Sequence, residues 1–183
     1  MQKFLSLTAL LSIIVLTGAS CTSTPKDAVV KIKTNNAGVS YVAKPEDSSY
    51  GELFKTASAK AGFHIYYPTF IPENVAEDKN FVWNKTSAII TLSEDPLNTS
   101  LQSITIKQDL TNDTANSIKT RLEKLTAKEN ITINGHPGYY GIYEAGKNKF
   151  ETVIFSTDDG VDVGVWSKWY PKNVLVHVAE SLK

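Results

Sequence analysis

The chain has 183 residues, with 19 basic and 19 acidic side chains, 42% hydrophobic residues and one cysteine. This length fits one modest globular domain, and a zero net charge with Arg121 as the only arginine argues against nucleic-acid binding. The single cysteine, Cys21, excludes internal disulfides, thiolate metal clusters and paired-thiol redox chemistry.

The first twenty residues have the pattern of an export signal. Lys3 precedes a largely apolar run from Phe4 to Leu16, and four small residues, 17–20, follow it. As a helix, this run would span about 20 Å, whereas the hydrocarbon core of a bilayer is roughly 30 Å thick. We therefore interpret residues 1–20 as a signal peptide and not as a transmembrane span.

Cys21 directly follows Gly18-Ala19-Ser20 at the end of this signal. The placement resembles the lipobox of bacterial lipoproteins, in which the cysteine becomes the acylated first residue of the mature chain. The resemblance implies that acyl chains such as palmitate on Cys21 hold the protein at the outer leaflet of the cell membrane or at an outer membrane. Gly18 stands where the lipobox usually has a branched apolar residue, so cleavage by ordinary signal peptidase after Ala19 is the alternative.

Residues 21–49 are rich in Ser, Thr, Asn, Lys and Pro, a composition that predicts a flexible tether with at most a short strand. The globular domain is expected at residues 50–183. Its first helix is predicted at about residues 50–61, because Ser48 or Ser49 provides an N-cap and Gly62 stands where a helix ends. Strands are then expected at residues 63–70, 81–84, 88–93 and 101–107.

An inserted helix is predicted after Asp113 or Thr114, either of which provides its N-cap. Its apolar stripe is formed by Ile118, Leu122 and Leu125, which are spaced at i, i+4 and i+7. The charged residues between them are expected to point to solvent, namely Lys119, Arg121, Glu123 and Lys124.

The last third of the chain predicts a β-meander closed by a helix. Asn134-Gly135 and Asp159-Gly160 are strong hairpin signals, and they separate strands expected at 131–133, 139–143, 150–156 and 161–169. Pro171 begins a terminal helix with an apolar stripe. The predicted fold class is α+β, an antiparallel, meander-rich sheet with N-terminal, inserted and C-terminal helices packed on it.

Four short segments together resemble a known family. They are Phe63-His64-Ile65-Tyr66-Tyr67-Pro68 with Ile71-Pro72, Ile104-Thr105-Ile106-Lys107-Gln108, Ile133-Asn134-Gly135-His136-Pro137-Gly138, and Val178-Ala179-Glu180-Ser181-Leu182. The pattern is similar to the small bacterial extracytoplasmic domains called domain of unknown function 4367, over about residues 63–183. The resemblance implies a hairpin-rich sheet outside the cytoplasm, and it transfers no catalytic residue, because that family has no assigned activity.

Candidate catalytic and metal-binding residues are few. His64, His136 and His177 have no HExxH or i, i+4 partner, and the chain has no Gly-x-Ser-x-Gly motif. We expect no catalytic residue, no metal and no cofactor. An envelope hydrolase remains an alternative, and it would require one of these histidines to meet an acid or a serine in a cleft.

Aromatic residues are the remaining candidates for a binding site. Adjacent strand residues point to opposite faces, so Tyr66 and Tyr67, or Tyr139 and Tyr140, cannot share one core. With Trp166 and Trp169, they suggest an aromatic groove on the second face of the sheet for an apolar ligand or a protein partner. The sequence thus predicts a non-enzymatic, lipid-anchored binding module of the bacterial envelope. The alternative is a carrier or sensor that holds an acyl or other apolar ligand between sheet and helix.

Overall fold

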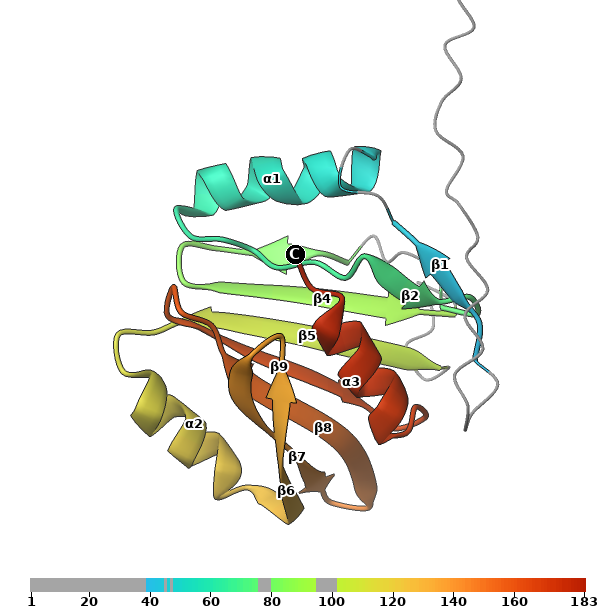
Figure 1. Cartoon of the computed structure of the whole chain (residues 1–183), viewed down its shortest axis with the longest axis vertical. Helices are drawn as coiled ribbons and strands as arrows, with labels where there is room; N and C mark the ends of the chain where they lie inside the picture. The colour runs from blue at the N-terminus through green and yellow to red at the C-terminus, as the bar shows by residue number, and fades with distance from the viewer. Residues whose placement is uncertain (1–38, 45, 47, 76–79, 95–101) are drawn as a thin grey trace, which may run out of the picture.

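A computed structural model of the chain describes residues 39–183, apart from 45, 47, 76–79 and 95–101. The predicted signal peptide, Cys21 and most of the predicted tether lie outside the described residues. The described residues form three helices and two antiparallel sheets (Figure 1). The predicted α+β fold class is confirmed.

The main sheet has seven strands in the order β3-β4-β5-β9-β8-β7-β6, and every neighbouring pair is antiparallel. The strands are β3 Val82–Trp83, β4 Ser87–Ser93, β5 Ser103–Leu110, β6 Leu125–Ile133, β7 His136–Ala145, β8 Asn148–Ser156 and β9 Val161–Ser167. A second, two-stranded sheet pairs β1 Tyr41–Ala43 with β2 Phe70–Pro72. The helices are α1 Ser49–Ala61, α2 Thr114–Leu122 and α3 Lys172–Glu180.

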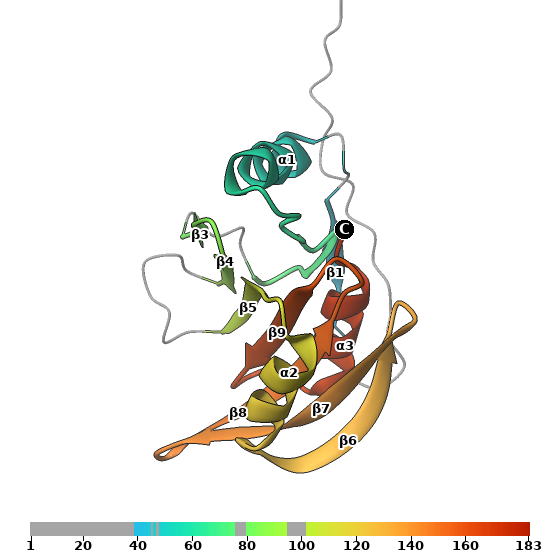
Figure 2. The ribbon, with the colours of Figure 1, turned by 90° about the vertical axis from the view of Figure 1, so that its left-hand side faces the viewer.

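The two faces of the main sheet are covered very differently. Alternate residues of the central strands, such as Ile106, Val153 and Val165, are fully buried on the first face. The apolar stripe of α3, including Val174 and Val178, joins them in one core. The second face carries α2 alone among the described helices, so that α2 and α3 lie on opposite sides of the sheet (Figure 2).

Side-chain and backbone caps form where the sequence predicts them. The Ser48 hydroxyl accepts a hydrogen bond from the Gly51 N–H at 3.3 Å, at the start of α1. Gly62 ends α1 with a φ of 84°, a left-handed conformation that favours glycine. The Asp113 carboxylate accepts from the Asn116 N–H at the start of α2. The predicted ends of these helices are therefore correct at both caps of α1 and at the N-cap of α2.

The strand predicted at 63–70 is wrong for most of its length, because only Phe70 joins β2. Residues 63–67 run between α1 and the main sheet without joining a ladder (Figure 2). The side-chain amide of Gln108 replaces a neighbouring strand, since its Oε1 accepts from the Tyr66 N–H and its Nε2 donates to the Tyr66 C=O, both at 2.7 Å. On the other side of the segment, Tyr67 and Lys183 exchange two backbone hydrogen bonds of 3.1 Å.

Two further boundaries differ from the predictions. Leu125 does not extend the stripe of α2, because it begins β6 and pairs with Tyr143 across the ladder; β6 is therefore longer than the strand predicted at 131–133. The folded part also begins before residue 50, since β1 pairs with β2 and Tyr41 is fully buried. For Leu125, pairing with Tyr143 overrides the helical spacing. For β1, the short strand that the sequence allowed within residues 21–49 pairs with β2.

Replacing Gln108 with leucine is expected to destabilise the fold by about 2–3 kcal/mol, because the leucine leaves the buried N–H and C=O of Tyr66 without partners. Gln108 is fully buried, and leucine roughly preserves its size. Urea unfolding of the purified protein measures the change. Gln102→Leu is the matched control, because the side chain of Gln102 accepts an exposed hydrogen bond, from Nδ2 of Asn74. A loss below about 1 kcal/mol for Gln108→Leu would show that other contacts hold the segment.

Candidate functional site

A cleft of about 560 Å³ lies between α2 and the second face of the main sheet. None of the nine residues of α2, all within the described part of the chain, is buried. The helix therefore stands over the sheet without filling the space beneath it. The volume falls within the roughly 300–1,000 Å³ range of small-molecule sites.

The floor of the cleft follows from the register of the central strands. Thr152 pairs with Trp166, and Ile154 pairs with Gly164, so all four residues lie on the face that α2 covers. A β-carbon on Gly164 would come within 3.2 Å of Nη1 of Arg121 and 3.3 Å of the Trp166 ring. Glycine in a central strand is typical of such a close approach, and here it leaves room for the guanidinium.

Aromatic rings form one side of the cleft. Tyr143 on β7 and Phe150 on β8 are register partners, and their ring centroids are 6.1 Å apart. Both line the cleft together with Leu125 at the start of β6. Tyr143 is 39% exposed, which makes it one of the few large hydrophobic side chains in the described part of the chain that face solvent.

Charged residues form the opposite side, on β5. The Asp109 Oδ2 atom accepts from Nη2 of Arg121 at 2.5 Å and from Nζ of Lys107 at 2.8 Å. Burial alone would raise the pKa of the Asp109 carboxyl, but hydrogen bonds from Lys107 and Ser87 and the charges of Lys107 and Arg121 outweigh it, so the pKa lies below its ordinary value. Asp109 thus stays ionised and attaches α2 to the sheet.

The six predicted aromatic residues do not meet in one groove. Trp166 lines the cleft under α2. Tyr139 lies on the same face, opposite Ile154 in the register, whereas Tyr140 lies on the other face, as strand alternation requires. Tyr67 is only 4% exposed and stacks on Phe54 of α1, with ring centroids 5.0 Å apart.

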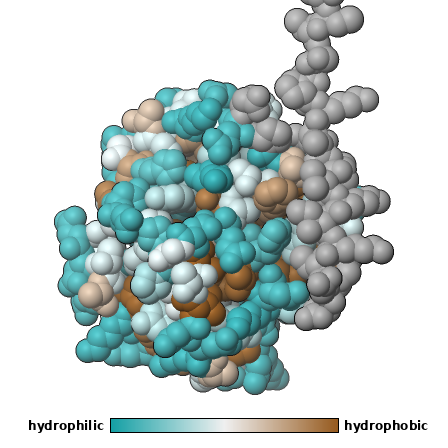
Figure 3. All heavy atoms as spheres, in the orientation of Figure 1, coloured by the Kyte–Doolittle hydropathy of each residue, from teal (hydrophilic) through white to brown (hydrophobic). Residues whose placement is uncertain are grey.

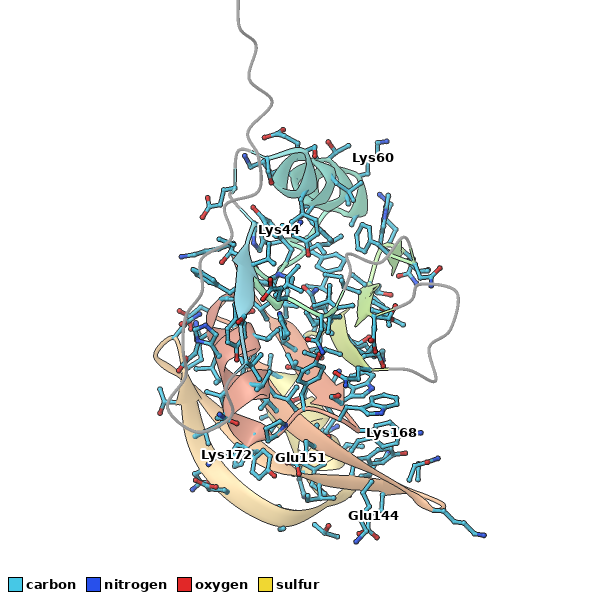
Figure 4. The ribbon with its side chains drawn as sticks, turned by 90° about the vertical axis from the view of Figure 1, so that its right-hand side faces the viewer. Lys44, Lys60, Glu144, Glu151, Lys168 and Lys172 are labelled. Carbon is cyan, nitrogen blue, oxygen red and sulfur yellow. The ribbon has the colours of Figure 1, made fainter. Side chains whose placement is uncertain are left out.

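Tyr66, Tyr140 and Trp169 lie at separate places. The Tyr66 hydroxyl donates to Asp159 at 3.0 Å. The Tyr140 hydroxyl donates to Glu151, and Nζ of Lys172 lies 5.3 Å from the Tyr140 ring, so that Lys172 and Glu151 are close together near the start of α3 (Figure 4). Trp169 is 38% exposed and lines a second cleft, of about 520 Å³.

This second cleft is a more polar hollow beside the start of α3. Glu73, Asn74 and Gln102 line it together with Trp169 and Tyr170. The Tyr170 hydroxyl donates to Oδ1 of Asn74 at 2.9 Å, and burial raises the pKa of Tyr170 to about 12. The hydroxyl is therefore neutral at any physiological pH, and it serves to join the hollow's two walls.

Arg121 corrects one expectation from the sequence. It was expected to point to solvent with Lys119 and Glu123, but its guanidinium lies over the sheet between Asp109 and Gly164. The sequence held two relevant signals, since Arg121 is the only arginine and the alternation of β5 places Lys107 and Asp109 on one face. No local pattern indicates that α2 lies over that face.

The three histidines lie apart from the cleft. Nδ1 of His136 is 3.4 Å from Oδ1 of Asp158, whose side chain is almost fully exposed. His64 contacts the Tyr66 ring, and His177 packs against Tyr41 and Phe70. Among the described residues, no group of three or more His, Cys, Asp and Glu side chains is placed to hold a metal ion.

Much of the visible surface is hydrophilic, with small hydrophobic areas between polar ones (Figure 3). In the described part of the chain, no helix combines the length and the apolarity needed to cross a membrane.

Fold and cleft together define a small α+β domain with one fully packed sheet face and one face left hollow under a short helix. The model of the family Domain of unknown function (DUF4367) matches residues 65–182. The chain therefore belongs to this family, as its four sequence segments predict. No curated protein and no solved structure matches the chain.

Replacing Asp109 with asparagine is expected to destabilise the protein by about 1 kcal/mol near pH 7, because Arg121 and Lys107 lose their shared anion. A carboxyl whose pKa is lowered on folding stabilises the folded state above its unfolded pKa of about 3.9, and this contribution is lost as the pH falls through the lower folded pKa. The difference between the native protein and Asp109→Asn should thus be constant from pH 7 to pH 5 and shrink below about pH 4.

Urea unfolding at a series of pH values measures this difference. Glu123→Gln, which removes an exposed carboxyl just after α2, serves as the control and should show no such pH dependence. A difference between the native protein and Asp109→Asn that persists unchanged at pH 3 would contradict the assignment of the ion pair.

Proposed function

We propose that this protein is a lipid-anchored, extracytoplasmic binding module that holds an apolar ligand in the cleft between α2 and the sheet. The observation that carries this proposal is the cleft itself, with aromatic and aliphatic side chains on its floor and along one side. Among the apolar strand residues of the lining, Phe150 and Trp166 are half-buried and Tyr143 is exposed, and covering such surface is favourable by about 25 cal/mol per Å². A ligand would supply that cover.

The anchor rests on the N-terminal sequence. Cys21 is the only cysteine, and it stands where the apolar run and its small residues end. In an exported protein, acylation accounts for this position better than a free thiol exposed to oxidation. Cleavage before Cys21 would also remove Lys3 and leave 18 basic against 19 acidic residues. The attachment to the membrane would then depend on the acyl chains, and two or more such chains give lasting attachment.

A binding role is supported over an enzymatic one by the chemistry of the cleft lining. Asp109 is the single carboxylate there, and two cations already share one of its oxygens. A carboxylate held ionised in this way is a poor general acid and a weak base. Within the described residues the cleft lining contains no histidine or cysteine.

Metabolic labelling with an alkyne fatty acid tests the anchor. Labelling and sedimentation with membranes are expected for the native chain and should be lost in Cys21→Ser, because the thiol is the acylation site. Ser20→Ala is the control for a change beside the cysteine that keeps the small-residue pattern. Equal labelling of the native chain and Cys21→Ser, or labelling of neither, would reject the anchor.

Nile red, a neutral apolar dye, tests the cleft. Saturable binding with a blue-shifted emission is expected, and Trp166→Ala should weaken it at least about fivefold, because the dye loses contact with the floor. Trp169→Ala is the matched control, since Trp169 is also partly exposed but lines the second cleft. Ser117→Trp fills the cleft from α2 without changing the sheet and should also abolish binding. If the affinity for the dye is unchanged in both Trp166→Ala and Ser117→Trp, the proposed site is wrong.

A further inference from the structure

The cleft under α2 is chemically asymmetric from one side to the other. Its β5 side carries Lys107 and Asp109, with Arg121 above them. Crossing the sheet through β9 and β8, the lining becomes apolar and ends at Phe150 and Tyr143. A ligand that fills the cleft therefore has one end beside the Asp109 ion pairs and the other among rings, where Nζ of Lys168 lies 5.2 Å from the Phe150 ring centroid.

The charges at the lining do not balance. Among the described residues, Lys107, Arg121 and Lys124 line the cleft against the carboxylate of Asp109, which leaves two positive charges in excess; Lys124 contributes from the aromatic side, next to Leu125. Asp162 is the nearest other acidic residue on this face, as the register partner of Asp109. It is fully buried, accepts from the Ser156 hydroxyl and does not line the cleft. At the described cleft lining a cationic ligand thus finds only the carboxylate of Asp109, whose Oδ2 already accepts from two cations.

The guanidinium of Arg121 has one nitrogen engaged and one available. Nη2 donates to Asp109 at 2.5 Å. Nη1 lies over Gly164, beside the ring of Trp166, because a β-carbon added to Gly164 would be 3.2 Å from Nη1 and 3.3 Å from that ring. Among the described residues, no acceptor takes a hydrogen bond from Nη1. Its N–H groups therefore stand at the boundary between the charged side and the apolar floor, where charge-assisted hydrogen bonds are strong.

We propose that the cleft selects a single-chain amphiphile with one anionic head, such as a long-chain carboxylate. The head pairs with Nη1 of Arg121 and with Lys107, and the chain crosses Trp166 toward Phe150 and Tyr143. This inference rests on the proposed function and adds to it the charge and the orientation of the ligand. A free fatty acid and a single-chain phospholipid share this chemistry and differ only in the anion.

Competition against Nile red tests the charge preference. The probes share a twelve-carbon chain: dodecanoate, monododecyl phosphate, dodecanol and dodecyltrimethylammonium, each below its micelle concentration at pH 8. The Cys21→Ser chain is used, because it carries no acyl group of its own to compete. We expect dodecanoate to displace the dye at least about tenfold more tightly than dodecanol, with the ammonium weakest. From octanoate to dodecanoate, affinity should rise about threefold to fourfold per methylene.

Variants of the charged side give the second arm. Arg121→Gln should weaken dodecanoate about tenfold and change dodecanol less than twofold, because only the anionic head loses its partner. Lys107→Gln should also weaken dodecanoate more than dodecanol, but by a smaller factor than Arg121→Gln. This variant keeps the test valid if Arg121→Gln folds poorly. Lys119→Gln is the matched control, since Lys119 is exposed on the same helix and does not line the cleft.

The outcomes separate the two proposals. If dodecanol competes as well as dodecanoate, or if Arg121→Gln and Lys107→Gln weaken both equally, the anionic preference is wrong and an apolar cleft remains. If neither Nile red nor any probe binds, both proposals fail together. Tighter binding of monododecyl phosphate than of dodecanoate supports the anionic head and identifies a phospholipid as the source.

Discussion

A wide antiparallel sheet presents two faces, and the described part of this chain provides enough helix to bury only one of them completely. Alternation along each strand places one row of side chains on each face. The first face meets α3 and the segment beneath α1, and its valines and isoleucines are fully buried. The second face meets only α2, which buries none of its own residues. The cleft is the direct result of this imbalance.

The ion pair between Arg121 and Asp109 helps to position α2 over the sheet and so shapes the cleft. No residue of α2 is fully buried, so its Asp113 cap and the contact from Arg121 to Asp109 help to hold the helix over the sheet. Lys107 shares the same carboxylate oxygen, and the lowered pKa of Asp109 keeps that anion charged. A partly exposed pair of this kind contributes modestly to stability, but it fixes where a cationic group stands over an apolar floor.

Gly164, in the central strand β9, leaves the space that the Arg121 guanidinium occupies in the cleft. Any side chain there would meet Arg121 and Trp166, so the glycine costs some strand stability and leaves space for a guanidinium. Gln108 acts similarly on the opposite face, where its amide takes the place of a strand beside Tyr66. Both residues lie in central strands. Gly164 leaves space for Arg121 of α2, and Gln108 binds the backbone of Tyr66, which pairs with no strand.

The sequence by itself determined the elements whose signals are local. The meander, its Asn-Gly and Asp-Gly turns and the caps at Ser48, Gly62 and Asp113 follow from hydrogen bonds and backbone conformations within a few residues. Strand alternation correctly separated Tyr139 from Tyr140, whereas the binding role of the aromatic residues stays a prediction. The extended run before Pro68 was misassigned because a side chain, not a strand, satisfies its backbone.

Only the tertiary structure decided which of those aromatics share a site. Of the six predicted residues, Trp166 lines the cleft under α2, together with Tyr143 and Phe150, which were not predicted, while Tyr67 and Trp169 lie elsewhere. Ladder register and the position of α2 decide this, because both depend on residues far apart in the chain. The same holds for Arg121, whose helical spacing suits solvent as well as a second layer. The direction of its side chain follows from the position of Asp109 on β5. The residues next to Arg121 in the sequence do not indicate that Asp109 lies within reach.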